Sequence, residues 1–575
     1  MKLFTPGSGL LASGALAFAT CTLLLFAATI GTYPPPTCDE SIYASSAVAL
    51  LEQGNFGVTL FPAGDPFLRD KNMVQFGRAY IASLAVVLRV GGIAWLSARA
   101  HAMLGWLLAA GLAAWLGVQL HGRWAGFAVA LLFASNTKAF LTAHLARPES
   151  WTAASILLAA CAVLWLLRAR APHAAGLWLA GALAAWPADF HGLALVFTLG
   201  FGVAVTVEVG LRRRAWRSAI IYAGGLASGL AMWGWLHWPG SDPRFMQQLT
   251  AFNYAPAAAG GAIAASIANL SSLAAWGRSV FWTSAGPISL VEAALAVIGL
   301  AWAWRSGSAA QRVLATTAVI AMLVYGLAVS QRLVQYGVLW SPFWYLLGVG
   351  ALVDAANSVG ARFPVEQRVI AGTTLVVTLL LAQLFAAVWL SYRYRGGNYR
   401  ELESKLRALV PAGARVLADP VWWWALRDGR TFLSEEYFIV TLQTQHAAVR
   451  DFLGTDSQLQ TTPALVRTLE LLRRTMWRLI MRWPARMGRA NRRVHCWSWC
   501  AHAAGRPAQL PARGWATPGK ASASWRSRLR STLAADEPRA RCGFERGGIP
   551  RLPSGAWSPV RRIPAALYHF NLFAG

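Results

Sequence analysis

The stretch 33-YPPPTCDESIYASSAVALLEQG-54 decides the fold, because it separates a membrane-spanning run from a short surface helix. The apolar run before it, at about 10–32, is too long for the core of a signal peptide and predicts a retained span. Pro34 to Pro36 end that span, since proline does not continue a helix beyond its first turn. The sequence therefore predicts a membrane helix followed by a segment at the membrane surface.

The same stretch carries the signals of a helix start and a helix end. Thr37 followed three residues later by Glu40 matches a capping box, and Gly54 is a common residue type just beyond a helix C-terminus. We therefore predict an amphipathic helix that starts at Thr37 and runs to about Gln53. Asp39 lies in its first turn, which points back at the top of the first span.

The composition fits a membrane protein. Only 13% of the 575 residues are charged and 56% are hydrophobic, with a mean hydropathy of +0.43. A soluble protein carries roughly 25% charged residues, so one large water-soluble fold is excluded. Apolar residues come in long runs rather than in alternation, which excludes an outer-membrane barrel. We predict an all-α polytopic membrane protein with about eleven spans, near 10–32, 101–120, 124–143, 151–167, 175–187, 192–209, 218–237, 285–303, 311–329, 337–355 and 369–391.

The stretch 79–98 is apolar but is flanked and interrupted by Arg78 and Arg89. Counting it as a span would place the basic cluster Arg212–Arg217 outside the cytoplasm, against the positive-inside rule. We therefore interpret it as a helix lying in the outer interface. The predicted location is a bacterial inner membrane, with a cytoplasmic N-terminus and with everything after residue 392 on the extracytoplasmic side.

Acidic residues collect in three predicted outer loops. Asp39 lies in the first loop, Glu149 follows Arg147 in the second, and the third holds Asp189 and His191. Each acid alone is sufficiently explained by a helix N-terminus, where caps and the helix dipole favour negative charge. His191 alone is commonly an interface residue. All three loops share one side of the membrane, and we predict that the acids of the first two, which flank the same early spans, converge on one site.

This pattern resembles the GT-C membrane glycosyltransferases, among them aminoarabinose transferases, protein O-mannosyltransferases and lipopolysaccharide-core transferases. The likeness covers about 10–440. It rests on an outer-loop element that reads Asp-Glu-x-x-Tyr-x-x-x-Ala-x-x-Leu-Leu-x-x-Gly, a basic outer helix, an arginine that opens the next span, and Arg-Pro-Glu in the second outer loop. In this sequence the residues are Asp39, Glu40, Tyr43, Ala47, Leu50, Leu51, Gly54, Arg99 and Arg147 to Glu149.

The resemblance implies a glycosyltransferase that moves a sugar from a polyprenyl-phosphate donor to an extracytoplasmic acceptor, which is a lipid, glycan or protein hydroxyl. It implies Asp39 as general base toward that hydroxyl and Glu149 as a second acid that orients or activates it. Glu40 is a further catalytic candidate. The chemistry is consistent, because a hydroxyl is a weak nucleophile and a carboxylate within hydrogen-bond reach takes its proton during attack on the anomeric carbon.

The phosphate of the leaving group requires cations, and arginine grips phosphate well. The family places basic or tyrosine residues near the lipid phosphate on a late outer loop, which implies Arg332. On the residues alone, an interface-anchoring arginine explains Arg332 equally well, and Tyr336 also fits an aromatic belt. The candidate substrate-binding residues are Arg69, Lys71, Arg147, His191, Arg278, Arg332 and Tyr336.

Two departures from the family pattern leave the donor sugar and the acceptor undecided. The Lys-Pro-Pro-type element late in the first outer loop is absent, with residues 68–73 in its place. The third loop reads Asp189-Phe-His191-Gly192 where His-Pro is common. We predict no metal ligands, because His495-Cys496-x-x-x-Cys500 is too short a set for a four-ligand zinc site. A divalent ion stays open as a cofactor, since some relatives use one.

We predict three domains: a GT-C-like transmembrane domain at 1–392, a partial extracytoplasmic α/β domain at 393–460, and a basic tail of low order at 461–575. In the second, a helical pattern near 398–410 precedes short strands at 415–418 and 431–433. Two short strands do not make a stable sheet, so more of the domain is expected to follow.

The end of the chain does not continue that pattern. Residues 471–575 hold 20 Lys+Arg and 3 Asp+Glu, but also seven tryptophans. Disordered tails are poor in aromatic residues, so an out-of-frame translation is the alternative to a real basic tail. The net charge of +28 does not indicate a nucleic-acid partner, because membrane proteins collect Lys and Arg in cytoplasmic loops.

Two other functions compete with the transferase. A transporter or flippase of a lipid-linked or anionic substrate needs ionisable groups near mid-membrane, for which Glu292 is the candidate. An inactive relative that only binds a polyprenyl lipid is the third hypothesis. For the transferase, the predicted partners are a polyprenyl-phosphate-linked sugar, an envelope lipid, glycan or protein acceptor, and membrane lipids.

Overall fold

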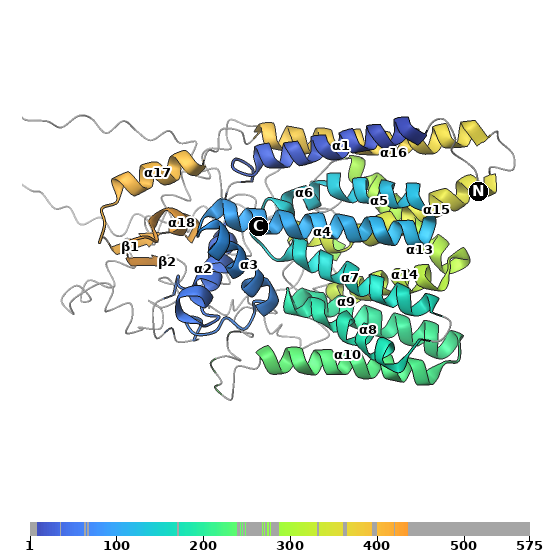
Figure 1. The fold of residues 1–575 in the computed structure, drawn as a ribbon, viewed down its shortest axis with the longest axis horizontal. Coiled ribbons are helices and arrows are strands. Elements are labelled where there is room, and N and C mark those ends of the chain that lie inside the picture. Colours follow the sequence, from blue (N-terminus) through green and yellow to red (C-terminus); the bar gives the residue numbers. More distant parts are fainter. Residues whose placement is uncertain are drawn as a thin grey trace, which may run out of the picture. The chain divides into compact units, whose positions relative to one another are not determined.

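The computed structural model is mostly helical (Figure 1). It describes residues 8–434 apart from 35, 62–64, 66–67, 170–171, most of 238–286, 330–332, 360–364, 394–398, 414, 419 and 430. The predicted tail at 461–575 and the end of the predicted α/β domain therefore lie outside the described residues.

Long helices make up most of the described chain. They are α1 (Ser8–Thr29), α4 (Trp95–His121), α5 (Arg123–Ser135), α6 (Thr137–Ala143), α7 (Glu149–Arg168), α8 (Ala174–Ala185), α9 (Leu195–Val205), α10 (Trp216–His237), α13 (Pro287–Ser306), α14 (Ala309–Ala328), α15 (Ser341–Val359) and α16 (Val365–Arg393). Short turns of helix join some of them: η1 (Trp186–Asp189), η2 (Gly192–Ala194), η3 (Thr206–Arg212) and η5 (Val334–Leu339). Each predicted span overlaps one of these helices or a helix pair.

The described helices identify a membrane protein. Among them, five helices are long and apolar enough to cross a membrane, or six if α5 and α6 form one broken span bent by 63°. Leu104, Leu107 and Leu108 on α4 are exposed, as expected for side chains that face lipid. The full count of eleven spans stays a prediction, and so does the orientation of the chain.

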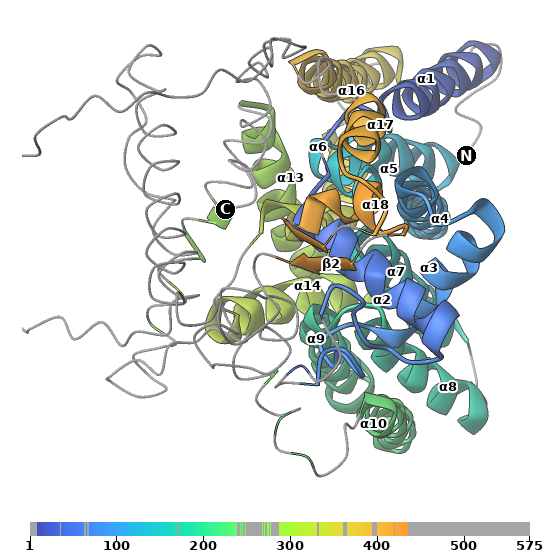
Figure 2. The same ribbon diagram turned by 90° about the vertical axis from the view of Figure 1, so that its left-hand side faces the viewer.

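The long helices pack mainly in neighbouring pairs: α4 contacts α5 and α7, α8 contacts α10, α9 contacts α14, and α13 contacts α15. α1 and α16 lie side by side (Figures 1 and 2). Small residues allow the closest approach of α4 and α5. A Cβ at Gly117 would lie 2.6 Å from the Gly126 Cα, so a side chain there would push the two helices apart.

The surface helix predicted from the sequence is α2 (Cys38–Gln53), and its bounds are confirmed. Its start is fixed by Glu40, whose carboxylate accepts a hydrogen bond from the Thr37 backbone N–H at 2.8 Å. Its end is fixed by Gly54, which has φ +70°, a conformation that glycine adopts without strain. Local signals were therefore sufficient to place this helix.

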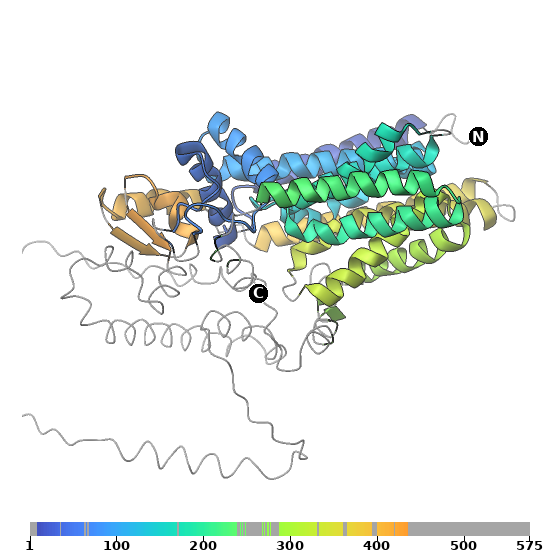
Figure 3. The ribbon, with the colours of Figure 1, turned by 90° about the horizontal axis from the view of Figure 1, so that it is seen from below.

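The apolar and basic stretch after it forms α3 (Arg78–Gly91), which has 14 residues. A span needs about 20 residues, so α3 is too short to cross a membrane. One face of α3 packs against α2, where Tyr80 and Tyr43 meet edge to face at 5.5 Å. In Figures 1 and 3, α2 and α3 lie at one end of the long helices.

A short mixed segment follows α16. It consists of α17 (Tyr399–Leu409), β1 (Arg415–Ala418), η6 (Pro420–Trp422), α18 (Trp423–Leu426) and β2 (Thr431–Ser434). β1 and β2 pair in parallel, with Arg415 opposite Thr431. Tyr399, Trp423 and Trp424 are buried in the same apolar cluster as α2 and α3. The α/β domain at 393–460 stays a prediction, because its last part is not described.

Candidate active site

The site begins at the N-terminus of α2, where Asp39 and Glu40 point to different partners. Arg99 on α4 holds Glu40 in a two-pronged ion pair, with distances of 2.8 Å to Oε1 and 3.0 Å to Oε2. The Glu40 carboxylate also accepts backbone N–H groups from Thr37 and, at 2.9 Å, from Ala146. Glu40 and Arg99 are both fully buried.

Glu40 therefore links three parts of the chain: α2, α4 and the loop that leads into α7. Its two oxygens receive four donors between them, which leaves little capacity to act on a substrate. A buried carboxylate with this many charged and neutral donors is a fixed anchor. The observed contacts of Glu40 hold these three segments together, and its catalytic role stays a prediction.

Asp39 and Glu149 meet at one arginine, Arg147, in the loop before α7. Arg147 forms an ion pair with the Asp39 carboxylate. It also donates two hydrogen bonds to Glu149 Oε1, at 2.8 and 3.0 Å. The predicted convergence of the first two outer loops is thus what the structure shows. We call Asp39, Arg147, Glu149 and Tyr336 the Arg147 cluster.

Aromatic side chains complete the surroundings of the guanidinium. Arg147 interacts electrostatically with the Tyr336 hydroxyl of η5, and its guanidinium lies 6.0 Å from the centre of the Tyr43 ring. The His191 ring meets the Tyr336 ring edge to face at 5.6 Å. Arg147 has only 4% of its side chain exposed, so these contacts hold it in a desolvated position.

The electrostatics of the loop residues follow from burial and from the charges in the cluster. Burial acts to lower the pKa of Arg147, but Glu149 overcomes it and the net pKa is raised. Burial lowers the pKa of His191 to about 4 and raises the pKa of Tyr336 to about 12. At neutral pH the arginine is therefore charged, while the histidine and the tyrosine are neutral.

The neutral histidine has a defined orientation. His191 Nδ1 accepts the backbone N–H of Leu193 at 3.0 Å. In the neutral ring one nitrogen accepts and the other carries the proton, so Nε2 is the donor. His191 thus places an N–H donor beside the Arg147 cluster.

The cluster keeps two unused features. Asp39 has 38% of its side chain exposed, although it is paired with a buried arginine. Glu149 is 1% exposed, and its Oε2 has no hydrogen-bond partner among the described residues. A buried oxygen without a donor costs about 1–3 kcal/mol. This cost is expected where a substrate group supplies the missing donor.

The third outer loop, which carries Asp189 and His191, lies next to the site. The Asp189 carboxylate lies near the N-terminus of α3, and its Oδ1 is 3.2 Å from His237 Nε2. Gly77 makes this approach possible, because a Cβ there would lie 2.1 Å from the Asp189 carbonyl oxygen. Burial raises the pKa of Asp189. Asp189 thus contacts His237 of α10, whereas His191 in the same loop reaches the cluster.

The remaining predicted residues are not part of the cluster as described. Arg69 is buried in an ion pair with Asp65, at 2.8 Å and 3.0 Å, and stacks on Phe61. Lys71 is exposed. Arg278 and Arg332 lie outside the described residues. The phosphate-binding assignments therefore stay predictions.

The cation between the two carboxylates of the cluster is Arg147. In the part of the chain that the structure describes, no group of three or more His, Cys, Asp and Glu side chains is arranged as metal ligands. The positively charged Arg147 guanidinium lies between the two carboxylates of the cluster and compensates their negative charge. No step is therefore derived through a metal ion.

Sequence reasoning missed two contributors. Tyr43 was recognised on the helix face and in the family element, but nothing in the sequence indicated its ring beside Arg147. The Glu40–Arg99 pair joins residues far apart in the chain, and no local pattern announces such a pairing. The Arg-Pro-Glu sequence correctly predicted that a helix begins at Glu149.

The fold matches solved structures, although no family profile and no characterised protein sequence matches this chain. ArnT from Cupriavidus metallidurans bound to undecaprenyl phosphate matches with a TM-score of 0.51 and 12% identity, over 73% of this chain and 85% of that chain. The same protein in the apo state gives 0.49 and 12% over the same shares. An Archaeoglobus fulgidus oligosaccharyltransferase, in complex with Zn and sulfate, gives 0.43 and 12%, over 73% of this chain and 61% of that chain.

ArnT and the oligosaccharyltransferase are GT-C glycosyltransferases. The similarity to ArnT shows that this chain has a GT-C fold, which confirms the resemblance found in the sequence. At 12% identity the likeness concerns the fold alone. The roles of individual residues are argued from the geometry of this chain.

Proposed function

We propose that this protein is a membrane glycosyltransferase that moves a sugar from a polyprenyl-phosphate donor to an acceptor hydroxyl of an extracytoplasmic lipid, glycan or protein. The observation that carries the proposal is the meeting of Asp39 and Glu149 on Arg147. A pair of carboxylates of different exposure, held by one buried cation, is suited to proton transfer from a hydroxyl.

Asp39 is the general base in this proposal. Its carboxylate is reachable, with 38% of the side chain exposed, and Arg147 favours its charged form. The acceptor oxygen attacks the anomeric carbon and forms the new glycosidic bond, while the bond from that carbon to the phosphate oxygen breaks. The acceptor proton passes to Asp39, and the lipid phosphate leaves with the bonding electrons.

Glu149 orients the acceptor. Its Oε2 is buried and takes no hydrogen bond from the described residues. A substrate hydroxyl that donates to this oxygen would remove the free-energy cost of an unsatisfied buried acceptor. Its Oε1 is fixed by Arg147, which prevents rotation of the carboxylate. Such fixation lowers the entropic cost of placing the hydroxyl beside Asp39.

The lipid phosphate needs a cationic partner. Lys71 is exposed on the first outer loop and is one candidate. Arg69 would first have to leave Asp65, which makes it a weaker one. Arg278 and Arg332 stay candidates from the sequence. The ArnT structure that matches this fold is bound to undecaprenyl phosphate, which agrees with a polyprenyl-phosphate donor for this chain.

The proposed setting is a bacterial inner membrane. We propose residues 1–392 as the transmembrane domain, with a cytoplasmic N-terminus, and α2, α3 and the segment from 393 on the extracytoplasmic side. The proposed partners are membrane lipids, the lipid-linked donor and an envelope acceptor. The donor sugar is left open by the residues of the site.

The transporter alternative depended on Glu292. In the structure this acid is paired with Lys138 and hydrogen-bonded through both oxygens, so it has no evident capacity to carry a substrate or proton. An inactive lipid-binding relative would not need the reachable carboxylate of Asp39. The transferase is therefore the proposal that uses the observed geometry most fully.

Mass analysis of envelope glycans tests the proposal. Cells lacking the protein should lose a sugar from one envelope component, and the wild-type chain should restore it. Asp39→Asn should fail to restore it although it is present in the membrane at the same level. Glu52→Gln, at the other end of α2 and exposed, is the matched control and should restore it. An unchanged glycan profile in the deleted cells would refute the transferase.

A further inference from the structure

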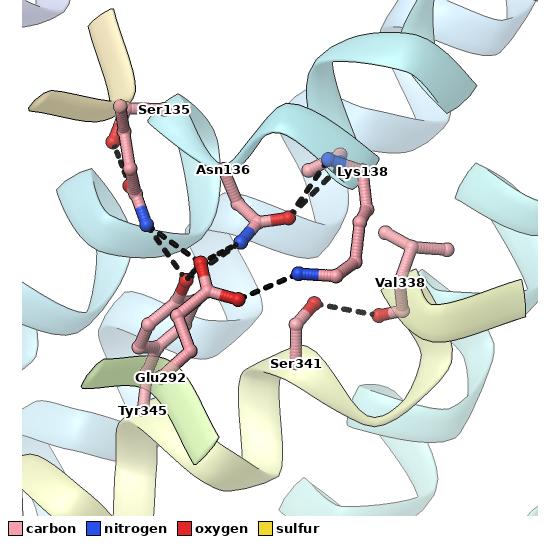
Figure 4. A network of polar contacts seen from close by, with 9 residues as sticks. Ser135, Asn136, Lys138, Glu292, Val338, Ser341 and Tyr345 are labelled. Carbon is pink, nitrogen blue, oxygen red and sulfur yellow. Dashed lines mark hydrogen bonds and ion pairs between the residues drawn. The ribbon is translucent and has the colours of Figure 1, made fainter. Parts of the chain in front are cut away.

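A second buried polar cluster lies where α5 breaks into α6. Glu292 of α13 is at its centre (Figure 4). Lys138 donates to Glu292 Oε2 at 2.5 Å, and Oε1 accepts from Asn136, Tyr345 and Gln383 at 2.5, 2.5 and 2.8 Å. We call these residues, together with Ser135, the Glu292 network.

The network joins five helices around the break: α5, α6, α13, α15 and α16. Asn136 supports the start of α6, because its side chain accepts the backbone N–H of Lys138 at 2.9 Å. Ser135 at the end of α5 donates to Gln383 of α16 at 2.7 Å, and Tyr345 contributes α15. A 63° bend leaves backbone groups without helical partners, and these side chains fix the direction in which α6 leaves the break.

The same segments lead directly into the Arg147 cluster. α6 has seven residues and is followed by the loop that carries Arg147 and Glu149. η5, which carries Tyr336, runs into α15 with Tyr345. α6 and η5 pack against each other, and α7 also contacts η5. Arg147 and Tyr336 are thus each connected by a short path to Glu292.

The far end of α6 is anchored as well. His144 follows α6, and its ring contacts Thr29 Oγ1 of α1 at 3.0 Å and the Phe140 carbonyl oxygen at 2.7 Å. Glu40 holds the Ala146 N–H just beyond. α6 is therefore a short helix held at both ends, and it connects Lys138 to the loop of Arg147.

We propose that Lys138, Glu292 and Tyr345 are positioning residues of the transfer reaction, which set the Arg147–Glu149 loop and Tyr336 in the arrangement that serves Asp39. The proposal rests on the proposed function. The proposed role is more than stabilisation of the fold. The network adjoins α6, which leads to Arg147 and Glu149, and α15, which follows the η5 segment that carries Tyr336.

Kinetics separate positioning from simple stability. The neutral pair Lys138→Met with Glu292→Gln is compared with a control pair at another interface, Arg312→Met with Glu208→Gln, whose wild-type distances are 2.6 and 3.0 Å. At saturating donor, below both melting temperatures, the first pair should lower kcat by about tenfold to a hundredfold with little change in the acceptor KM. A fall in kcat of the same factor in the control pair would overturn the proposal.

A milder variant keeps the test valid if the neutral pair does not fold. Tyr345→Phe removes one hydroxyl and should lower kcat severalfold at an unchanged melting temperature, and Lys138→Arg should retain more activity than Lys138→Met. A kcat in Tyr345→Phe equal to that of the wild type, together with equal activity in the two Lys138 variants, would overturn it.

Hydrogen exchange gives a reading that does not depend on transfer activity. Amides in the loop 144–148 should exchange at least several times faster in the neutral pair or in Tyr345→Phe than in the wild type, but not in the control pair. Equal exchange in this loop would overturn the positioning role. If the wild type transfers no sugar while the loop responds as expected, the proposed function fails and the structural coupling stands.

Discussion

The Arg147 cluster and the Glu292 network are both buried groups of charge, but they differ in what they leave unsatisfied. In the network, both oxygens of Glu292 are hydrogen-bonded and the acid is 1% exposed. In the cluster, Glu149 Oε2 has no partner among the described residues, and Asp39 reaches the surface. The Glu292 network is therefore closed, whereas the Arg147 cluster is open to a ligand.

This difference shows how to separate support from chemistry in a membrane protein with many buried charges. A buried charge is tolerated when it is paired and hydrogen-bonded, and such a pair needs no function beyond holding helices together. An unused buried acceptor carries a cost that a purely structural site would remove. Within the described part of the chain, the Arg147 cluster combines this cost with a reachable carboxylate, so we propose that the reaction occurs there.

Removal of Arg147 should have the largest effect. Arg147→Met leaves the buried Glu149 and its neighbour Asp39 without their common cation, which should lower the free energy of unfolding by about 3–5 kcal/mol and abolish transfer. Thermal unfolding in detergent and a transfer assay measure both. A variant with wild-type melting temperature and turnover would show that the cluster is not the centre of the site.

Breaking the closed network on one side should be nearly as costly to stability. Lys138→Met leaves Glu292 with neutral donors only, and we expect a loss of about 3 kcal/mol. Adding Glu292→Gln should recover most of it, because the remaining partners then surround a neutral amide. Melting temperatures of the single and double variants measure this. Additive losses would contradict the closed ion-pair description.

Glu149→Gln sharpens the assignment of the open oxygen. The amide keeps an oxygen for Arg147 but offers an N–H where Oε2 would accept the acceptor hydroxyl. Turnover should fall by about tenfold to a hundredfold, which corresponds to roughly 1.4–2.7 kcal/mol. Steady-state kinetics measure it. If only the KM of the donor changed, Glu149 would belong to the donor side.

The pH dependence of stability should report His191. Its pKa is about 4 in the folded protein against 6.5 for an unperturbed histidine. Between these values the unfolded chain binds more protons, so the free energy of unfolding should fall as the pH is lowered from about 6.5 toward 4. His191→Gln should weaken this fall, measured as the difference in melting temperature between pH 7 and pH 5. An identical difference in both proteins would contradict a buried neutral histidine.

Substitution in an exposed ion pair should have the smallest effect on stability. Lys405 and Glu401 on α17 pair at 2.5 Å, but both are more than half exposed. Glu401→Ala should leave both the melting temperature and the turnover close to those of the wild type. A large loss of stability measured by thermal unfolding would mean that exposed charges contribute more than buried ones in this protein.

Local signals made much of the architecture predictable. The capping box and Gly54 gave the bounds of α2, and the run of apolar residues gave most of the long helices. Arg-Pro-Glu correctly placed Arg147 and Glu149 at the start of α7. These features depend on neighbours in sequence, which is why the sequence alone indicated them.

Contacts between distant residues were not predictable in the same way. Lys138 and Glu292 pair across separate helices, as do Glu40 and Arg99. From the sequence, Glu292 was recognised only as an isolated acid within an apolar helix, because its partners lie far from it along the chain. The same limit applies to Glu40, whose four hydrogen-bond donors include groups on α4 and on the loop before α7.

Asp39 provides the most direct test of the account. Turnover of a purified polyprenyl-phosphate sugar should be measured for the wild type, Asp39→Asn and the control Glu52→Gln, with melting temperature recorded for each. We expect Asp39→Asn to lose about 10²–10⁴-fold in turnover while it stays folded and while the control remains active. Wild-type turnover in Asp39→Asn would contradict the assignment of this carboxylate as the base.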